Sequence, residues 1–278
     1  MSAELLINVT PSESRVVLIE NGILQEIHVE RHTKRGLVGN IYRGKVSRVL
    51  PGMQAAFVDI GLEKAAFLHA SDIVIHNEIA EEVSASHIQK QDIRELVRDG
   101  QDIVVQVVKD PIGTKGARLT TDITIPSRYL VFMPSVTHVG VSQRIEEEAE
   151  RERLKTLVQE FCDENGGFIL RTAAEGVGKA ELQQDAAFLR RLWDKIQSRM
   201  KKRKSNVLYE DLPLARRVLR DFVGTELDRI RIDSKLSFQE LFQFTKEYVP
   251  EMNGKLEYYT GDRPIFDLHD VENETQRA

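Results

Sequence analysis

The residues best suited to chemistry lie in GGFILRTAAEGVG, residues 166–178. An apolar run ends there at Arg171 and Thr172, and a glycine-rich turn follows. A guanidinium group, a hydroxyl group and free backbone N–H groups together could bind a small anion such as a phosphate. The alternative is a strand end with a salt bridge, for which Glu175 is the candidate partner. The residues alone favour the salt bridge, and both interpretations stay open.

Two phenylalanines offer a second kind of chemistry. Phe57, in AAFVDIG, and Phe67, in AAFLHA, each lie in an expected strand. Aromatic side chains on the surface of a small barrel can stack on nucleic-acid bases when cations surround them. His69 is expected at the polar rim of such a surface. The residues that could surround the two phenylalanine rings are Tyr42, Arg43, Lys45 and Lys115. The pattern is equally compatible with phenylalanines that fill the barrel interior.

Other catalytic or metal-binding motifs are weak. His28 and His32 are four residues apart, but on a strand and the connector after it, so they do not indicate a metal site. Acidic candidates for a magnesium-dependent hydrolase are Asp221, Glu226, Asp228, Asp267 and Asp270. They form no compact motif, and we expect them to be surface charges and helix caps. A self-sufficient hydrolase that uses some of these aspartates remains an alternative, which a magnesium-dependent cleavage assay decides.

Composition sets broad limits on function. The chain has 278 residues, of which 41% are hydrophobic and 30% charged, which predicts a soluble protein of two or three domains. The net charge of −5 argues mildly against a nucleic-acid binder, although local fields decide where a polyanion binds. The single cysteine, Cys162, excludes an intramolecular disulfide. With no signal-peptide pattern at the N-terminus, we expect a cytoplasmic location and no membrane association.

The chain divides into four segments with different patterns of expected strands and helices, which predicts an α+β multidomain protein. Residues 1–38 contain three expected strands, with a hairpin turn at Asn21-Gly22. Residues 39–125 contain five expected strands, with a polar insertion and a short helix at 93–97 before the fourth. This pattern is typical of a closed barrel of the oligonucleotide-binding type.

The remaining two segments mix helices and strands. Residues 126–212 contain strands around 128–134, 138–145 and 166–172, and helices over 145–161 and 180–203. The second helix places Trp193 on its apolar face, so we expect Trp193 in the core. Residues 213–278 contain a helix after Pro213, one strand at 228–233 and a helix capped by Ser237.

Several of these stretches resemble one family. GNIYRGKVSRVLPGMQAAFVDIGLEKAAFLHASDI and GQDIVVQVVKDPIGTKGARLTTDI are similar to the S1-type RNA-binding domain of the bacterial ribonuclease E/G family. SRYLVFMP, GFILRTAAEGV and IFDLHDVENETQRA resemble other parts of the same proteins. The resemblance implies an RNase H-like subdomain that is split into residues 1–38 and 213–278. Its insertions are then an S1-type barrel with the OB-fold (39–125) and an α/β 5′-sensor subdomain (126–212).

The resemblance also implies roles for individual residues. Members of the family cut single-stranded RNA during RNA processing and decay, and favour RNA with a 5′-monophosphate. Arg171 and Thr172 match the pair that binds this phosphate, and Val131 matches the residue that packs against the terminal base. In the barrel, Phe57, Phe67 and Lys115 match the RNA contacts.

The family's catalytic residues have no match in this sequence. They are magnesium-binding aspartates in a DNase I-like subdomain, which is followed by cysteines that share zinc between subunits. In the RNase H-like part, Asn8 stands where a working site would need a carboxylate. We therefore expect this chain to bind and orient RNA, with no catalytic residue, metal or cofactor of its own. The resemblance extends over only the N-terminal part of the family's proteins. Magnesium, zinc and homo-oligomer formation would belong to the longer parent enzyme, of which this chain would be the N-terminal part. The alternative is a stand-alone, non-catalytic RNA-binding protein.

Overall fold

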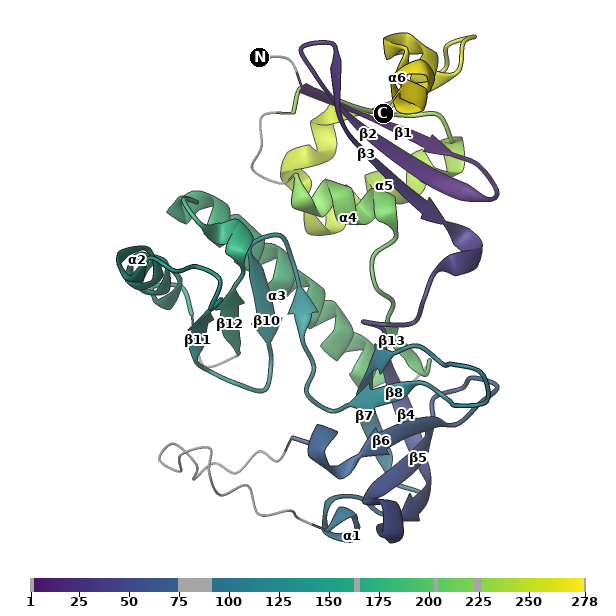
Figure 1. Ribbon diagram of the computed structural model, residues 1–278, viewed down its shortest axis with the longest axis vertical. Helices are drawn as coiled ribbons and strands as arrows, with labels where there is room; N and C mark the ends of the chain where they lie inside the picture. Colours follow the sequence, from purple (N-terminus) through teal and green to yellow (C-terminus); the bar gives the residue numbers. More distant parts are fainter. Residues whose placement is uncertain (1–2, 75–91, 163–165, 203–204, 223–226, 278) are drawn as a thin grey trace. The chain divides into compact units, whose positions relative to one another are not determined.

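The computed structural model describes residues 3–74, 92–162, 166–202, 205–222 and 227–277. The chain divides into two compact units (Figure 1). Unit 1 comprises residues 1–35, 177–191 and 212–278, and unit 2 comprises residues 36–176 and 192–211. α3 (Lys179–Lys202) contributes its first part to unit 1 and its second part to unit 2. None of the helices in the described ranges has the length and apolar character of a membrane span.

Unit 1 is built on a mixed sheet with the strand order β15-β14-β1-β2-β3. Its strands are β1 (Ala3–Val9), β2 (Glu13–Glu20), β3 (Ile23–Arg31), β14 (Arg229–Ile232) and β15 (Leu256–Tyr258). The three strands predicted for the first segment are present and form an antiparallel meander, whereas β14 runs parallel to β1 and β15 parallel to β14. The prediction of a single strand in the last segment is wrong, because β15 is too short to show an alternating pattern.

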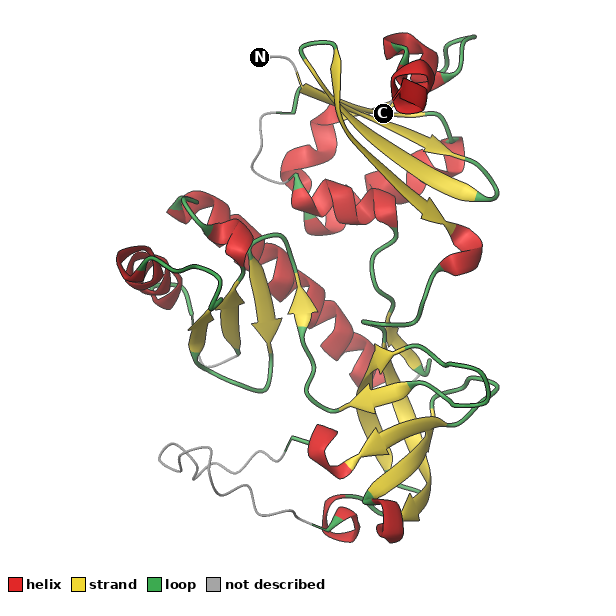
Figure 2. Cartoon of the chain, in the orientation of Figure 1, coloured by secondary structure: helices red, strands yellow, loops and turns green. Residues whose placement is uncertain are grey.

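Helical segments cover both faces of this sheet (Figure 2). Leu6, Val17 and Ile19 pack against the segment that contains α6 (Val271–Arg277). On the opposite face, α4 (Leu214–Asp221) packs on β2 and β3, and α5 (Lys235–Tyr248) packs on β14 and β15. The predicted cap of α5 is wrong. The helix begins three residues earlier, where the Ser234 side chain accepts the N–H of Ser237.

Unit 2 contains the predicted barrel. Its strands are β4 (Ile41–Leu50), β5 (Ala55–Asp59), β6 (Ala66–His69), β7 (Asp102–Lys109) and β8 (Arg118–Thr120). The order β4-β5-β6-β8-β7 is closed by pairing of β4 with β7. The predicted short helix is present as α1 (Ile93–Leu96). Its residue Ile93 is part of the barrel core. The predicted polar insertion lies largely outside the described residues. A further strand that the sequence did not suggest, β13 (Val207–Tyr209), pairs with β4.

The second part of unit 2 is a four-stranded sheet with the order β11-β12-β10-β9. Its elements are β9 (Ile125–Pro126), β10 (Leu130–Met133), β11 (Val139–Val141), β12 (Gly167–Leu170) and the helix α2 (Glu148–Gln159). The Phe132 ring lies 5.3 Å from that of Phe168 and 6.1 Å from that of Trp193. Trp193 therefore packs against the core, as predicted. This packing leaves the opposite face of β10 and β12 as the candidate binding surface.

Candidate nucleic-acid interface

Phe57 and Phe67 lie on the outer surface of the barrel. Side chains alternate along a strand, and the neighbours of both phenylalanines are buried in the barrel core: Ala56, Val58, Ala66 and Leu68. Both phenylalanines are half-buried on the opposite face. They are direct partners in the β5–β6 pairing, with ring centroids 6.3 Å apart in an edge-to-face arrangement. The interpretation that they fill the barrel interior is therefore wrong.

The two phenylalanines stand in a row with two cations. Arg48 on β4 lies directly opposite Phe57, and Arg118 on β8 lies directly opposite Phe67. Arg48 is exposed, whereas Arg118 is held by two hydrogen bonds to Asp72, of 2.9 and 3.1 Å. Neither arginine was predicted from the sequence, because the β4–β5 register contains an irregularity and the β6–β8 pairing joins distant segments. The row combines stacking surfaces with positive charge, as a single-strand-binding surface requires.

Two of the residues predicted to surround the phenylalanine rings, Tyr42 and Arg43, do not do so. Tyr42 is only 3% exposed and belongs to the barrel core, where its hydroxyl accepts a hydrogen bond from Asn40 at 3.1 Å. Arg43 is half-buried, and its guanidinium donates to the carbonyl oxygen of Met200 at the end of α3. Lys45 remains exposed, opposite Asp59 in the β4–β5 pairing. The cations nearest to the phenylalanines in strand register are therefore Arg48 and Arg118.

Lys115 is exposed in a loop that is tied to β6. The Phe67 N–H donates to the carbonyl of Ala117 at 2.8 Å, two residues after Lys115. Gly116 makes this approach feasible, because a Cβ atom there would lie 2.0 Å from the Ala65 carbonyl oxygen. The structure thus brings the predicted residues Phe57, Phe67 and Lys115 to one region of the barrel surface.

The end of β12 brings Arg171 and Val131 onto one face of the other sheet. Val131 lies opposite Ile169, and the Arg171 N–H continues the same strand pairing with a 2.8 Å bond to the Tyr129 carbonyl. Alternation therefore places Val131 and Arg171 on the face opposite the buried Phe132 and Phe168 layer. Arg171 and Thr172 are exposed and Val131 is half-buried.

The expected salt bridge from Arg171 to Glu175 is not formed. Arg171 donates instead to the carbonyl oxygen of Ser127, a bond that orients the guanidinium. A guanidinium has several N–H donors, and for the others no acceptor is present among the residues that the structure describes. The side chain thus keeps donors for an anion while its position is fixed.

The glycine-rich turn provides fewer free N–H groups than its sequence suggested. It begins as a 3₁₀ turn over Thr172–Ala174, in which the N–H groups of Ala174 and Glu175 bond the carbonyls of Arg171 and Thr172. The N–H of Gly176 donates to Glu150 Oε1 at 2.8 Å. These three groups are engaged because the turn is helical and is tied to α2. The donors left at the strand end are the first N–H groups of the turn, the Thr172 hydroxyl and the Arg171 guanidinium.

Glu150 holds this turn in place. It accepts two hydrogen bonds from Arg153, of 2.6 and 2.7 Å, in addition to that from Gly176. These bonds favour the carboxylate and lower the pKa of Glu150 from 4.5 to about 2, with the Arg153 hydrogen bonds as the largest cause. A lowered pKa stabilises the folded state above about pH 4.5, and this contribution is lost as the pH falls towards 2.

Replacing Glu150 with glutamine is therefore expected to lower the melting temperature near pH 7 and to have little effect near pH 2. The loss in free energy of unfolding at neutral pH should be about 1 kcal/mol or less, since the ion pair lies near the surface. Thermal melts of both proteins across this pH range test the prediction. Glu152→Gln, an exposed carboxylate on the same helix, is the matched control. A Glu150→Gln effect that is independent of pH would contradict the assignment.

Three of the acidic candidates of unit 1, Asp221, Asp228 and Asp270, have structural partners. Asp221 pairs with Arg220 at 2.7 Å, and Asp228 accepts the N–H of Ala3 at 3.0 Å. Asn8 donates to Asp233 and accepts from Arg15. Glu226 lies outside the described residues. Across the described ranges, no group of three or more His, Cys, Asp or Glu residues is arranged to hold a metal ion.

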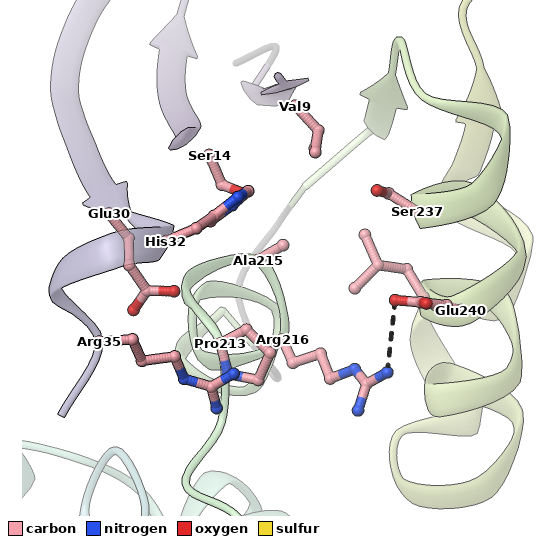
Figure 3. A pocket seen from close by; sticks show the side chains of 11 residues that line it. Val9, Ser14, Glu30, His32, Arg35, Pro213, Ala215, Arg216, Ser237 and Glu240 are labelled. Carbon is pink, nitrogen blue, oxygen red and sulfur yellow. Dashed lines mark hydrogen bonds and ion pairs between the residues drawn. The ribbon is translucent and has the colours of Figure 1, made fainter. Parts of the chain in front are cut away.

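A cavity of about 290 Å³ in unit 1 is also lined by paired side chains (Figure 3). His32 lies between the Ser14 hydroxyl, at 2.9 Å, and the Pro11 carbonyl, at 3.1 Å. The Glu30 carboxylate accepts the N–H of Leu214 and a hydrogen bond from Arg217. The His32 contacts join the turn after β3 to β2, and the Glu30 contacts join β3 to α4, which is a structural role.

The barrel and its surface define the class of protein. A closed five-stranded barrel that presents aromatic and cationic side chains is typical of oligonucleotide-binding domains. Residues 37–118 match the S1 RNA binding domain, and residues 124–278, more than half of the chain, match the Ribonuclease E/G family. The chain belongs to the ribonuclease E/G family, as its motifs predicted.

Curated relatives agree with this assignment. The whole chain aligns with ribonuclease G from Escherichia coli strain K12 at 68% identity and with ribonuclease G from Haemophilus influenzae strain Rd at 62% identity. In both cases the alignment covers 57% of the relative's own length. Its identity to ribonuclease E of E. coli K12 is 30%, over 99% of this chain and 26% of that protein. The predicted resemblance to the ribonuclease E/G family is thus confirmed. The chain spans little more than half the length of the ribonuclease G relatives it matches.

Proposed function

We propose that the chain is the RNA-binding and 5′-monophosphate-sensing portion of a ribonuclease G-like endoribonuclease for single-stranded RNA. The observation that carries the proposal is the pair Phe57–Phe67 on the outer face of the S1 barrel, with Arg48 and Arg118 in register on either side. Aromatic rings stack on unpaired bases, and the flanking cations attract the backbone. The resulting binding is specific for single strands because paired bases do not expose their faces.

In this proposal, the second sheet of unit 2 is the 5′-sensor. Arg171 and Thr172 bind the terminal phosphate, and Val131 packs against the first base. Support comes from the placement of Val131 and Arg171 on one face and from the Ser127 bond that orients the guanidinium. A monophosphate suits these donors because guanidinium and hydroxyl groups form charge-assisted hydrogen bonds with its oxygens.

Unit 1 is proposed to be the split RNase H-like subdomain, with a structural role. Support comes from its sheet, in which strands from residues 3–31 pair with strands from residues 229–258. The segments between them are then the inserted barrel and sensor. Asn8, bonded to Asp233 and Arg15, occupies a position where metal-dependent hydrolysis would need a carboxylate.

The parent enzyme is proposed to be a cytoplasmic, homo-oligomeric, magnesium-dependent endoribonuclease whose catalytic aspartates and zinc-sharing cysteines lie outside these 278 residues. Its role would be RNA processing and decay. The relatives are named ribonucleases, whereas the described residues of this chain offer no cluster that fits a metal. The chain's own contribution is to bind RNA, fix its direction and present it.

The chain is accordingly expected to bind single-stranded RNA without cleaving it in magnesium. Incubation of end-labelled RNA with increasing protein, followed by native and denaturing electrophoresis, measures both properties at once. The expected result is a shifted complex that contains intact RNA and weakens with added salt. Dose-dependent cleavage that survives repurification and is lost in Asp228→Asn or Asp267→Asn would overturn this proposal in favour of a self-sufficient hydrolase.

A further inference from the structure

Resting on the proposed RNA-binding role of the barrel, we propose that the basic end of α3 binds the phosphate backbone of single-stranded RNA beyond the bases that stack on the barrel. The last turn of α3 contains three cations, Arg199, Lys201 and Lys202. This part of the helix and the barrel both belong to unit 2. The backbone-binding residues of the proposal are Lys201 and Lys202, which extend the RNA site from the barrel to the helix.

The end of α3 lies against the outer face of β4. Tyr42 is in the barrel core, so alternation along the strand directs its neighbour Arg43 outwards. The Arg43 guanidinium donates to the carbonyl oxygen of Met200 in the last turn of α3. The backbone N–H of Arg43 donates to the carbonyl of Asn206, just after the helix, at 2.7 Å. These bonds place the helix end on the same outer face as the two phenylalanines.

A further hydrogen bond holds this helix end in position. Arg199 Nη1 donates to the Leu208 carbonyl at 3.0 Å, and Leu208 is in β13, the strand that pairs with β4. The helix end is thus tied to the barrel directly through Arg43 and indirectly through β13. A cationic surface that is fixed before RNA arrives loses less conformational freedom on binding than a mobile one.

Cations connect the stacking surface to the end of α3 along β4. Arg48, opposite Phe57, and Lys45 are both exposed. From Arg48 to Arg43 the strand spans about 16 Å, at roughly 3.3 Å per residue. An RNA strand that leaves Phe57 along β4 therefore reaches the helix end within a few nucleotides. The carboxylate of Asp59 lies beside this path, opposite Lys45, and already accepts a backbone N–H at 2.8 Å.

Lys201 and Lys202 have the exposure and the charge that a phosphate backbone requires. Both side chains are exposed, and neither forms an ion pair with any residue in the described part of the chain. The whole chain has a net charge of −5, so the cations at this helix end are a local feature and not a consequence of composition. Lysines near a helix C-terminus also interact favourably with the helix dipole, a structural role that the test must separate.

The test compares two oligouridylates with 5′-hydroxyl ends, one of about four nucleotides and one of about fifteen. The short strand occupies the stacking surface, and only the long strand extends to α3. Fluorescence anisotropy over a range of salt concentrations measures both affinities. Each phosphate contact on a single strand contributes about 0.7 to the slope of log affinity against log salt concentration. For the wild type, the long strand is expected to bind more tightly and with a steeper slope.

In Lys201→Gln/Lys202→Gln, the slope for the long strand is expected to become shallower by about 1.4, and its affinity at about 0.1 M salt to fall about tenfold. The affinity for the short strand should not change. Lys201→Arg/Lys202→Arg keeps both charges and should retain the wild-type slope. Lys235→Gln/Lys246→Gln is the matched control, because it removes two exposed lysines from α5 in unit 1 and should affect neither strand. Melting temperatures of all variants show whether the helix end survives.

The inference is overturned if Lys201→Gln/Lys202→Gln binds the long strand with the affinity and slope of the wild type, or if the control variant loses as much. Phe67→Ala separates this failure from that of the proposed function. If Phe67→Ala weakens binding of the short strand while the α3 variant matches the wild type, only the inference about α3 fails. If the wild type binds neither strand, or Phe67→Ala leaves both affinities unchanged, the proposed function of the barrel fails as well.

Discussion

Replacing Phe67 with alanine is expected to weaken the affinity of the chain for a short single-stranded RNA about tenfold or more. The Phe67 ring makes an edge-to-face contact with the Phe57 ring on the outer face of the barrel, with ring centroids 6.3 Å apart. The loss of one base–aromatic stack costs about 1–3 kcal/mol, and about 1.4 kcal/mol corresponds to a tenfold change in affinity. Phe57→Ala should have a similar effect, because Phe57 is the direct cross-strand partner of Phe67 on the same outer face.

Fluorescence anisotropy with a labelled RNA measures this effect, with thermal melts of each variant alongside. Val108→Ala is the matched control, because Val108 is an exposed apolar residue of the same barrel, on β7. It should leave affinity unchanged. A Phe67→Ala protein with both wild-type affinity and wild-type stability would show that the ring is a bystander on the barrel surface.

Replacing Arg171 with glutamine is expected to abolish a preference for 5′-monophosphorylated RNA over 5′-hydroxyl RNA. We expect this preference to be about tenfold in the wild type. Hydrogen bonds to charged groups contribute about 1.5–3 kcal/mol, and the lower value applies to an exposed side chain such as Arg171. Thr172→Val should reduce the preference in part, because it removes one hydroxyl donor.

Titrations of two RNAs that differ only at the 5′ end, against the wild type and each variant, measure the preference directly. Arg144→Gln is the control, since Arg144 is another exposed arginine of unit 2. If Arg171 has only a structural role through the Ser127 carbonyl, Arg171→Gln will lower the melting temperature and leave the end preference intact. Equal affinities of the wild-type chain for both RNAs would contradict sensing by this chain.

Local patterns predicted most of the fold. The Asn21-Gly22 turn has the positive φ angles, 51° and 81°, that such a hairpin needs. The barrel and α3 were evident because alternation and helical periodicity extend over many residues. The strands that were missed, β9, β13 and β15, have two or three residues, and only pairing with distant segments makes them strands. The cap of α5 was misplaced because two serines, Ser234 and Ser237, fit the same pattern.

The site was less predictable than the fold. The residue types at the end of β12 suggested an anion site. Only the structure shows that the Ser127 carbonyl oxygen, rather than the Glu175 carboxylate, accepts a hydrogen bond from the Arg171 guanidinium. Strand alternation did not determine whether Phe57 and Phe67 lie on the inner or the outer face of the barrel, because either face of a barrel strand can hold an aromatic ring. Arg48 could not be aligned with Phe57 from sequence, because an irregularity in the β4–β5 register shifts the pairing.

Ultraviolet cross-linking of a 5′-monophosphorylated single-stranded RNA to the chain, with the attached peptides identified by mass spectrometry, measures directly whether the two surfaces of unit 2 bind RNA. Cross-links are expected in peptides from the outer face of the barrel, around Arg48, Phe57, Phe67 and Lys115. Cross-links from the 5′-terminal nucleotide are predicted in peptides that contain Val131 or Arg171. Cross-links confined to unit 1, with none in either region of unit 2, would contradict RNA binding by the barrel and by the end of β12.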